Sequence, residues 1–259
     1  MTPGAVSHQV KGLEEFLRVQ LFRRLPQRVL LTDVGQAFLT ELRECFARVD
    51  RAVERVLESD ARGPLAVSVA PAFAAKWLGP RLQRFSAANP EIDLRISASL
   101  AMIDFQRDSF DAAIRLGRGN YPGLVSVKLF DESVTPMCSP RLLEGDHQLS
   151  TPDDLRHHVL LHDDSLDFDT AAPHWGDWLE AAGVSTVDPT RGPHFSHPDH
   201  SLQAAIDGAG VVLGWRSLAL ADLEAGRVVA PFDLALPLGL DFYLVYPEGH
   251  GDRPKVAAF

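Results

Sequence analysis

The feature that most constrains the fold is an alternation of two kinds of segment from Leu65 onward. Short apolar runs of strand length alternate with amphipathic runs of helix length, and Gly, Pro, Asn or Asp separate them. The expected strands are residues 65–70, 92–96, 112–116, 125–130, 134–138, 158–162, 194–196, 211–213 and 242–246. The expected helices are residues 74–88, 175–182, 202–208 and 217–225, with two more that begin at Ser139 and Thr151. This alternation indicates open α/β sheets, and we expect two of them.

The residues before Leu65 have a different pattern, which predicts a helix, a turn and a strand. Thr2 is a suitable N-cap, Pro3 suits the first helical position, and apolar residues recur at helical spacing as far as Leu17. A reversal of the chain is expected near Pro26, before the β-like run at residues 29–31. A helix, a basic turn and a strand are together the parts of a wing.

Thr32 and Asp33 then cap a second and longer helix. Its apolar positions recur every three or four residues from Val34 to Leu57, with charged residues between them. A stripe this long and narrow predicts a partner helix from another chain. The alternative is that the helix packs on its own body. Residues 60–64 contain Gly63 and Pro64 and are expected to end the helix as a linker.

The net charge of −10 conceals two parts of opposite sign. Residues 1–32 hold five basic and two acidic residues, whereas the rest holds 20 basic and 33 acidic residues. A small basic segment joined to a large acidic one is expected where one end meets the phosphates of nucleic acid.

Composition excludes several classes of protein. The N-terminal residues lack the basic start and apolar core of a secretory signal, and no apolar run is long enough to span a membrane. Cys45 and Cys138 are too few and too far apart for a disulfide scaffold. We therefore expect a cytoplasmic protein with no membrane partner.

The sequence also lacks the common signatures of catalysis. It has no nucleophile elbow, zinc-protease motif or phosphate loop, so we expect neither an enzyme nor a bound cofactor. His194, His197 and His200 have a spacing that could bind zinc, nickel or copper. The alternative is loop or cleft histidines, and we favour it because the three lie where a strand gives way to a helix.

Ligands of open α/β sheets bind beyond the carboxyl ends of the strands, near helix N-termini. By this rule the candidate ligand-binding residues are Ala72, Phe73, Ser99, Leu100, Arg115, His162, His197, Ser201 and Trp215. Ser201 has a second interpretation, as the cap of the helix that follows it. Arg115 and Arg216, together with helix N-termini, favour a carboxylate or amino-acid-like ligand.

Three N-terminal segments resemble the winged helix-turn-helix of LysR-type transcriptional regulators: residues 2–15, Leu21-Phe22-Arg23-Arg24 and residues 29–35. The resemblance continues through the chain. Residues 77–82, 117–124, 136–140, 162–163 and 202–206 are similar to one subgroup, which includes the regulators of glycine-cleavage and β-lactamase genes.

The resemblance implies a mixed α/β chain of three parts. These are a partial winged helix-turn-helix at residues 1–32, a dimerising linker helix at 33–63, and a two-lobed effector-binding domain at 64–259 that resembles periplasmic binding proteins. Lobe I would comprise residues 64–136 and 239–259, and lobe II residues 137–238, with crossovers near 136–139 and 236–242. Cys138, at the first crossover, is an additional effector-site candidate.

The same resemblance implies a DNA-reading helix that starts at Pro3. The residues it assigns to DNA are Thr2, Pro3, Ala5, Ser7, His8, Lys11 and Arg28. The family has a further helix before Thr2 and more residues after Phe259, so the resemblance implies a chain truncated at both ends.

The implied function is a ligand-responsive transcriptional regulator. It would bind promoter DNA as a homodimer or homotetramer, hold a small metabolite in its interlobe cleft, and have RNA polymerase as a further partner. The alternative is a small-molecule-binding module that has lost DNA binding through the missing N-terminal helix.

Overall fold

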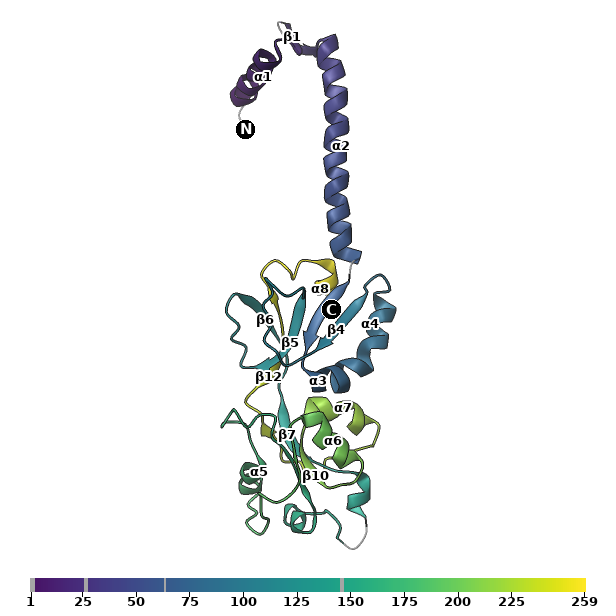
Figure 1. The fold of residues 1–259 in the computed structure, drawn as a ribbon, viewed down its shortest axis with the longest axis vertical. Coiled ribbons are helices and arrows are strands. Elements are labelled where there is room, and N and C mark those ends of the chain that lie inside the picture. The colour runs from purple at the N-terminus through teal and green to yellow at the C-terminus, as the bar shows by residue number, and fades with distance from the viewer. Residues whose placement is uncertain (1–2, 26–27, 63, 145–146) are drawn as a thin grey trace. The chain divides into compact units, whose positions relative to one another are not determined.

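A computed structural model describes residues 3–25, 28–62, 64–144 and 147–259. Side chains at 3, 24, 25, 28 and 50–62 lie outside this description. The chain forms two compact units, Met1–Asp60 and Ala61–Phe259 (Figure 1). Among the described residues, no helix combines the length and the apolar character needed to cross a membrane.

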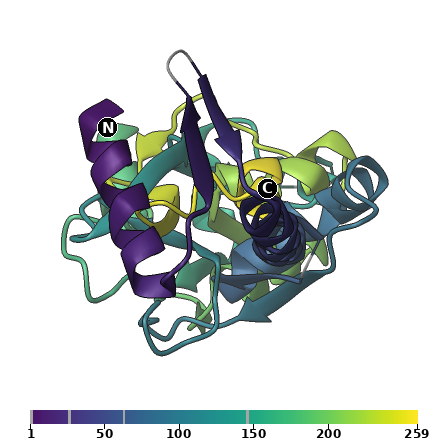
Figure 2. The same cartoon turned by 90° about the horizontal axis from the view of Figure 1, so that it is seen from above.

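The N-terminal unit consists of two helices and a hairpin (Figure 2). Helix α1 spans Pro3–Leu17, strands β1 (Phe22–Leu25) and β2 (Arg28–Leu31) pair antiparallel, and α2 spans Asp33–Arg62. The Glu14 carboxylate joins α1 to the hairpin, because its Oε1 accepts hydrogen bonds from the backbone N–H of Leu21 at 2.8 Å and of Phe22 at 3.0 Å.

The start of α2 is fixed by Thr32 and Gly35. The Thr32 hydroxyl accepts the N–H of Gly35 at 3.0 Å and donates to the Gln20 carbonyl at 2.7 Å. The capping function predicted for Thr32 is therefore confirmed. A Cβ at position 35 would lie 2.1 Å from the Leu21 oxygen, so this junction requires glycine.

The first sheet of the second unit, with its helices, is called lobe I below. Its strand order is β4-β3-β5-β12-β6, in which β3 is parallel to β4 and β5, and β12 is antiparallel to β5 and β6. The strands are β3 (Leu65–Val69), β4 (Leu94–Ala98), β5 (Ala112–Gly117), β6 (Leu124–Phe130) and β12 (Asp241–Pro247). The helices are α3 (Pro71–Phe73), α4 (Leu82–Ala88) and α8 (Pro254–Ala258).

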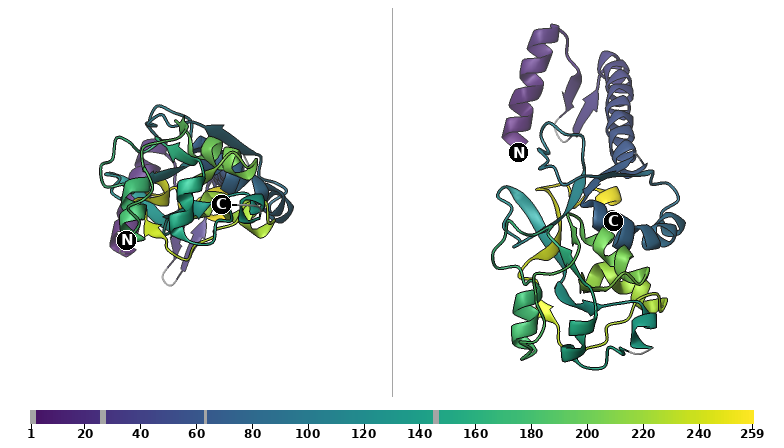
Figure 3. Two further views of the ribbon diagram at one scale, coloured as in Figure 1. Left: turned by 90° about the horizontal axis from the view of Figure 1, so that it is seen from below. Right: turned by 60° about the horizontal axis from the view of Figure 1, so that its bottom comes forward.

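The second sheet, with its helices, is called lobe II. Its order is β11-β7-β10-β8-β9, and Figure 3 shows both sheets from two further directions. The strands are β7 (Ser133–Met137), β8 (Leu160–Asp163), β9 (His194–Phe195), β10 (Val211–Trp215) and β11 (Leu236–Pro237). The helices are α5 (Trp175–Ala181), α6 (Pro198–Ile206) and α7 (Arg216–Glu224).

The chain crosses between the lobes at residues 131–132 and 238–240. The second crossing lies within the predicted range of 236–242. The first lies before the predicted range of 136–139, because all of β7 is part of the second sheet. Residues 133–136 therefore belong to lobe II and not, as expected, to lobe I. Asp131, Glu132 and Ser133 separate the two apolar runs, but nothing in this short polar break indicates that the chain changes sheet there. Glu132 marks it in the structure, because its buried carboxylate accepts hydrogen bonds from the N–H of Ser133 and of Ser217, at 2.9 and 3.2 Å.

Several predicted helices differ from those observed. Residues 74–88 form a π-helical turn (Ala74–Leu78), a 3₁₀ turn (Gly79–Arg81) and α4, because Pro80 lacks the N–H that a continuous helix requires. The helices expected at Ser139 and Thr151 are short 3₁₀ turns. Helix α6 begins at Pro198, with His197 as N-cap, so Ser201 lies inside the helix and does not cap it.

Candidate functional site

A cavity of about 490 Å³ lies between the two lobes. Both sheets and the segments that follow β3, β4, β5 and β8 contribute to its wall. The predicted residues that line it are Ala72, Phe73, Ser99, Leu100, Arg115, His197 and Trp215. Residues chosen by the strand-end rule therefore line the cavity from both lobes. The volume of the cavity suits a small ligand.

Arg115 lies in the lobe I wall and is held entirely by neutral oxygen atoms. Its guanidinium donates to the Ser68 hydroxyl at 2.6 Å, to the carbonyls of Ser68 and Ile114 at 3.1 and 2.9 Å, and to the Ala101 carbonyl at 3.3 Å. Among the described residues, no carboxylate lies within ion-pair distance of Arg115. Burial lowers the pKa of the guanidinium, and the nearby Tyr121 opposes that shift. The cavity wall thus carries a partly desolvated cation without a counter-ion.

Aromatic rings join the two lobes at the base of the cavity. The Phe242 ring lies 4.5 Å from that of Phe73 and 6.3 Å from that of Trp215, measured between centroids. Phe73 and Phe242 belong to lobe I, whereas Trp215 ends β10 in lobe II. A displacement of one lobe against the other must therefore disturb these ring contacts.

Two ion pairs also connect the lobes. Arg118, which follows β5, contacts the Asp169 carboxylate at 2.7 Å, and both residues line the cavity. Lys76 lies 3.4 Å from the buried Asp222 of α7, which also binds Arg227 at 2.7 Å. Both side chains of the Lys76–Asp222 pair are largely covered, so this pair is better shielded from solvent than a surface salt bridge, whereas Arg118 is 60% exposed.

Three predicted ligand residues do not line this cavity. Cys138 is fully buried, its N–H bonds to the Val229 carbonyl, and burial raises the pKa of its thiol to about 11. Ser201 is also buried, and its hydroxyl donates to the Pro198 carbonyl at 3.1 Å. His162 lies farther inside lobe II, as described below. Arg216, considered with Arg115 as a source of positive charge, is exposed and does not reach the cavity wall.

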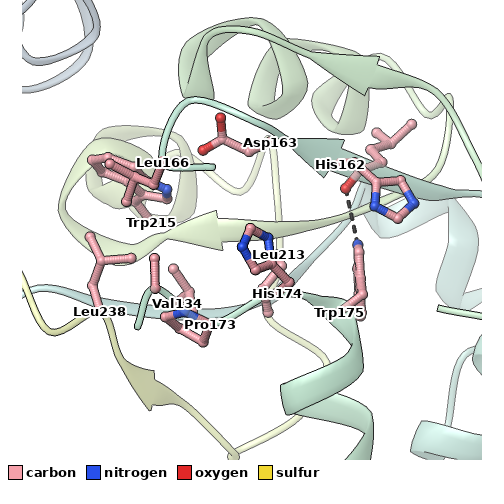
Figure 4. A pocket seen from close by; sticks show the side chains of 12 residues that line it. Val134, His162, Asp163, Leu166, Pro173, His174, Trp175, Leu213, Trp215 and Leu238 are labelled. Carbon is pink, nitrogen blue, oxygen red and sulfur yellow. Dashed lines mark hydrogen bonds between the residues drawn. The ribbon is translucent and has the colours of Figure 1, made fainter. Parts of the chain in front are cut away.

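His162 lines a separate, much smaller cavity of about 30 Å³ in lobe II (Figure 4). Asp163, His174 and Trp175 also line it, and the Trp175 indole donates to the Leu161 carbonyl at 3.0 Å, the bond that is dashed in Figure 4. Burial raises the pKa of Asp163 and lowers the pKa of His162. The volume is about that of one water molecule, so this cavity is too small for a metabolite.

The three histidines of the spaced motif separate in the fold. His194 stacks on His162 with a centroid separation of 4.2 Å and binds Asp164 at 2.8 Å. His197 instead meets His200 edge-on at 5.2 Å. Within the described ranges, no group of three His, Cys, Asp or Glu side chains is arranged to hold a metal ion.

Sequence reasoning missed the loops that complete the cavity. The cavity residues that it did not propose include Met102, Arg118, Ser165, Leu166, Phe168 and Asp169. Most of them lie several residues beyond the end of β4, β5 or β8. The strand-end rule predicts only residues adjacent to the end of a strand, so it does not include them. The aspartates between Asp163 and Asp169 are the sequence signal that could have indicated a functional loop after β8.

In the N-terminal unit, helix α1 presents Ala5, Ser7, His8 and Lys11 to solvent. The Lys11 ammonium lies 3.7 Å from the carboxylate of Glu15, and both side chains are largely exposed. The predicted contact residue Thr2, and the side chains of Pro3 and Arg28, lie outside the described part of the structure.

Two family models match the chain. Residues 1–36 match the bacterial regulatory helix-turn-helix protein of the lysR family, and residues 58–259 match the LysR substrate binding domain. The second match alone covers more than half of the chain.

Curated relatives match along the full chain. The chain is 42% identical over 259 residues to the glycine cleavage system transcriptional activator of Escherichia coli K12, covering 83% of that protein. It is 35% identical over 260 residues to the HTH-type transcriptional activator AmpR of Pseudomonas aeruginosa, covering 84% of it.

Solved structures agree with these matches. The effector domain of P. aeruginosa AmpR has a TM-score of 0.60 and 31% identity, over 76% of this chain and 92% of that one. Full-length AphB of Vibrio cholerae has a TM-score of 0.61 over all of this chain and 88% of that one, but only 20% identity, so it supports the fold alone.

Proposed function

Since the chain belongs to the LysR family of bacterial transcriptional regulators, we propose that its effector is a small carboxylate or amino-acid-like anion bound in the interlobe cavity. The resemblance drawn from the sequence, the mixed α/β fold and the ligand-responsive regulatory function are confirmed by the family and structural matches. The effector class, the residues that contact it and the division of labour along the chain are proposals.

Arg115 is the observation that carries this proposal. A guanidinium that is partly removed from water is stabilised by a nearby anion. Because both terminal nitrogens of Arg115 already donate to protein oxygens, an anion would be attracted mainly by the charge. The cavity offers Arg115 only neutral oxygens, whereas the neighbouring Arg118 already has Asp169 as its partner. Arg115 is therefore the cation that we assign to the effector.

Binding must also favour one arrangement of the lobes over another, because only a difference in affinity can shift an equilibrium. The cavity wall comes from both lobes, and the Phe73–Phe242–Trp215 contacts span them. An effector bound to both walls would hold the lobes in one arrangement. We propose this step as the link from effector to transcription.

Substitution of Arg115 tests the effector class. We expect glycine, alanine and short carboxylates to raise the unfolding temperature of the protein if they bind the cavity. Arg115→Gln should abolish this rise, and Arg115→Lys should keep part of it because it retains the charge. Arg95→Gln is the matched control, since Arg95 pairs with Asp93 at 3.1 Å outside the cavity. Equal responses from the wild type and Arg115→Gln would refute the assignment.

For the N-terminal residues, we propose that α1 enters the major groove of promoter DNA with Ala5, Ser7, His8 and Lys11 facing the bases and phosphates. Their exposure on one short helix supports the proposal, as does the basic charge of residues 1–32. Duplexes selected from a random library, with binding measured at several salt concentrations, would test it. Binding that does not weaken with salt would contradict phosphate contacts.

We also propose that residues 33–63 form the contact between copies of this chain, as a homodimer or homotetramer. The exposed apolar residues Val34, Phe46 and Val49 on α2 support this assignment. RNA polymerase is a further proposed partner, because the named relatives are transcriptional activators. We propose regulation and not catalysis, since the cavity contains no nucleophile–base pair among its lining residues.

A further inference from the structure

Three large apolar side chains around the interlobe cavity are left in solvent. Leu100 and Met102, in the segment that follows β4, are 67% and 88% exposed, and Phe168, in the segment that follows β8, is 80% exposed. All three line the cavity, two from lobe I and one from lobe II. We refer to Leu100, Met102 and Phe168 as the apolar rim.

Single exposed apolar residues are common on protein surfaces and require no explanation. The apolar rim differs because its three members come from two lobes and border one cavity. Leaving such side chains in water is unfavourable, because the burial of apolar surface is favourable in proportion to the area covered. A ligand that supplies an apolar surface at this place would therefore gain affinity.

The segments that carry the rim are fixed by hydrogen bonds. In lobe I, the Ser99 N–H bonds to the Val69 carbonyl at 2.9 Å, and the Ala101 carbonyl accepts a bond from Arg115 at 3.3 Å. Ala101 lies between the two rim residues of this segment, so Arg115 directly supports the backbone that positions them. The proposed anion site and the rim are thus parts of one structure.

The lobe II segment is held across the cavity. Phe168 precedes Asp169, whose carboxylate pairs with Arg118 of lobe I at 2.7 Å and accepts the Ala171 N–H at 3.1 Å. The Asp169 N–H bonds to the Leu166 carbonyl at 2.8 Å. The interlobe ion pair therefore keeps Phe168 at the cavity while leaving its ring uncovered.

We infer that the effector is amphipathic: an anionic group pairs with Arg115, and an apolar group of the same molecule is covered by Leu100, Met102 and Phe168. This inference rests on the proposed function, because it assumes that Arg115 binds an anion. The chemical class is a carboxylate with an aliphatic or aromatic tail, and the rim residues determine specificity for the tail.

A series of straight-chain acids tests the inference on the full chain. Calorimetric titration with butanoate, hexanoate and octanoate should show an affinity that rises up to about fourfold with each added methylene. In Phe168→Ser the increase should fall below about twofold per methylene, while the affinity for butanoate stays unchanged. Met102→Ser should have the same effect to a smaller extent.

Control variants separate the rim from the anion site. Val159→Ser removes an apolar side chain that is 48% exposed but outside the cavity, and it should retain the full dependence on chain length. Arg115→Gln should weaken the binding of all three acids, including butanoate. Hexanol, which lacks the carboxylate, should not compete with hexanoate.

The outcomes are distinguishable. If the wild type binds the three acids with equal affinity and Arg115→Gln binds none, the rim inference is overturned and the proposed anion site stands. If Phe168→Ser and Met102→Ser both keep the full dependence on chain length, the rim is likewise excluded. If no acid binds, or binding survives in Arg115→Gln, both the proposed effector class and the rim inference fail.

Discussion

The two units of this chain place their apolar residues in opposite ways. The C-terminal unit encloses large side chains such as Phe73, Trp178 and Phe242, each less than 2% exposed. Among the described side chains of the N-terminal unit, Leu21 is the buried apolar residue, while Phe16 is 83% and Phe46 66% exposed. The C-terminal unit therefore carries its own hydrophobic core, whereas most of the described apolar side chains of the N-terminal unit are exposed.

Charge divides the chain in a related way. Residues 1–32 have an excess of basic residues, and the rest has an excess of acidic ones. Because acidic surfaces repel DNA, this division of charge supports the proposal that α1 contacts the duplex. The comparison fits the proposal that one unit supplies the stable core and binds the effector, while the other contacts DNA and a second copy of the chain.

The largest expected effect is in the core of the C-terminal unit. Trp178 is fully buried and donates its indole N–H to the Leu234 carbonyl at 3.1 Å. Trp178→Ala should lower the free energy of unfolding by about 3–5 kcal/mol, because it leaves a cavity. Urea unfolding followed by circular dichroism measures this change. Phe16→Ala should change the free energy of unfolding by less than about 0.5 kcal/mol. A similar loss in both variants would contradict the difference in burial between the two units.

The next effect concerns association. If α2 pairs with a second copy, Phe46→Ser should raise the dissociation constant between copies at least about tenfold, since burying such a side chain contributes roughly 1.5–3 kcal/mol. Sedimentation velocity over a range of concentrations measures it. Glu44→Ser, on a charged and exposed position of the same helix, is the control. An unchanged constant in Phe46→Ser would show that α2 does not mediate association through this residue.

A smaller effect is expected for DNA. Lys11→Ala should make the plot of log affinity against log salt concentration shallower by about 0.9, the slope that one phosphate contact contributes. Fluorescence anisotropy with a labelled duplex measures it. Arg95→Ala, a basic residue of the C-terminal unit, should leave the slope unchanged. If it changed the slope as Lys11→Ala does, DNA contact would not be confined to the N-terminal unit.

The smallest expected effect is the pH dependence that Glu132, at the crossing between the lobes, gives to the stability of the folded protein. Burial raises the pKa of Glu132 above its ordinary value of 4.5, so the folded protein keeps a proton that the unfolded chain has released. As pH rises from 4.5 through the folded pKa, stability should fall relative to that of Glu132→Gln, which cannot titrate. Urea unfolding of both proteins between about pH 4 and pH 7 checks this. Parallel profiles would exclude Glu132 as the source.

Much of the fold could be predicted because the sequence patterns that mark helices and strands agree with the contacts that these elements make in the folded chain. Thr32 caps α2 as expected, and Arg115 was found because strand ends meet at one edge of a sheet. The expectation that Ser201 caps its helix is wrong, because α6 begins three residues earlier, at Pro198. A proline at the first helical position marks the start of a helix as strongly as a serine cap does.

The remaining differences depend on long-range contacts. Phe168 and Asp169 lie at the cavity, where Asp169 pairs with Arg118, which is distant in sequence. The change of lobe at Glu132 likewise depends on Ser217, which lies 85 residues later. Local sequence patterns do not specify these partners.

The position of β12 determines the order in which the chain can fold during synthesis. This strand, Asp241–Pro247, lies between β5 and β6 and is hydrogen-bonded to both. Every strand of lobe II leaves the ribosome before β12 does, so lobe II can form while lobe I still lacks an interior strand. During that interval the edges of β5 and β6 are unpaired and open to wrong partners. Synthesis of β12 therefore completes the first sheet only after every strand of lobe II has been made.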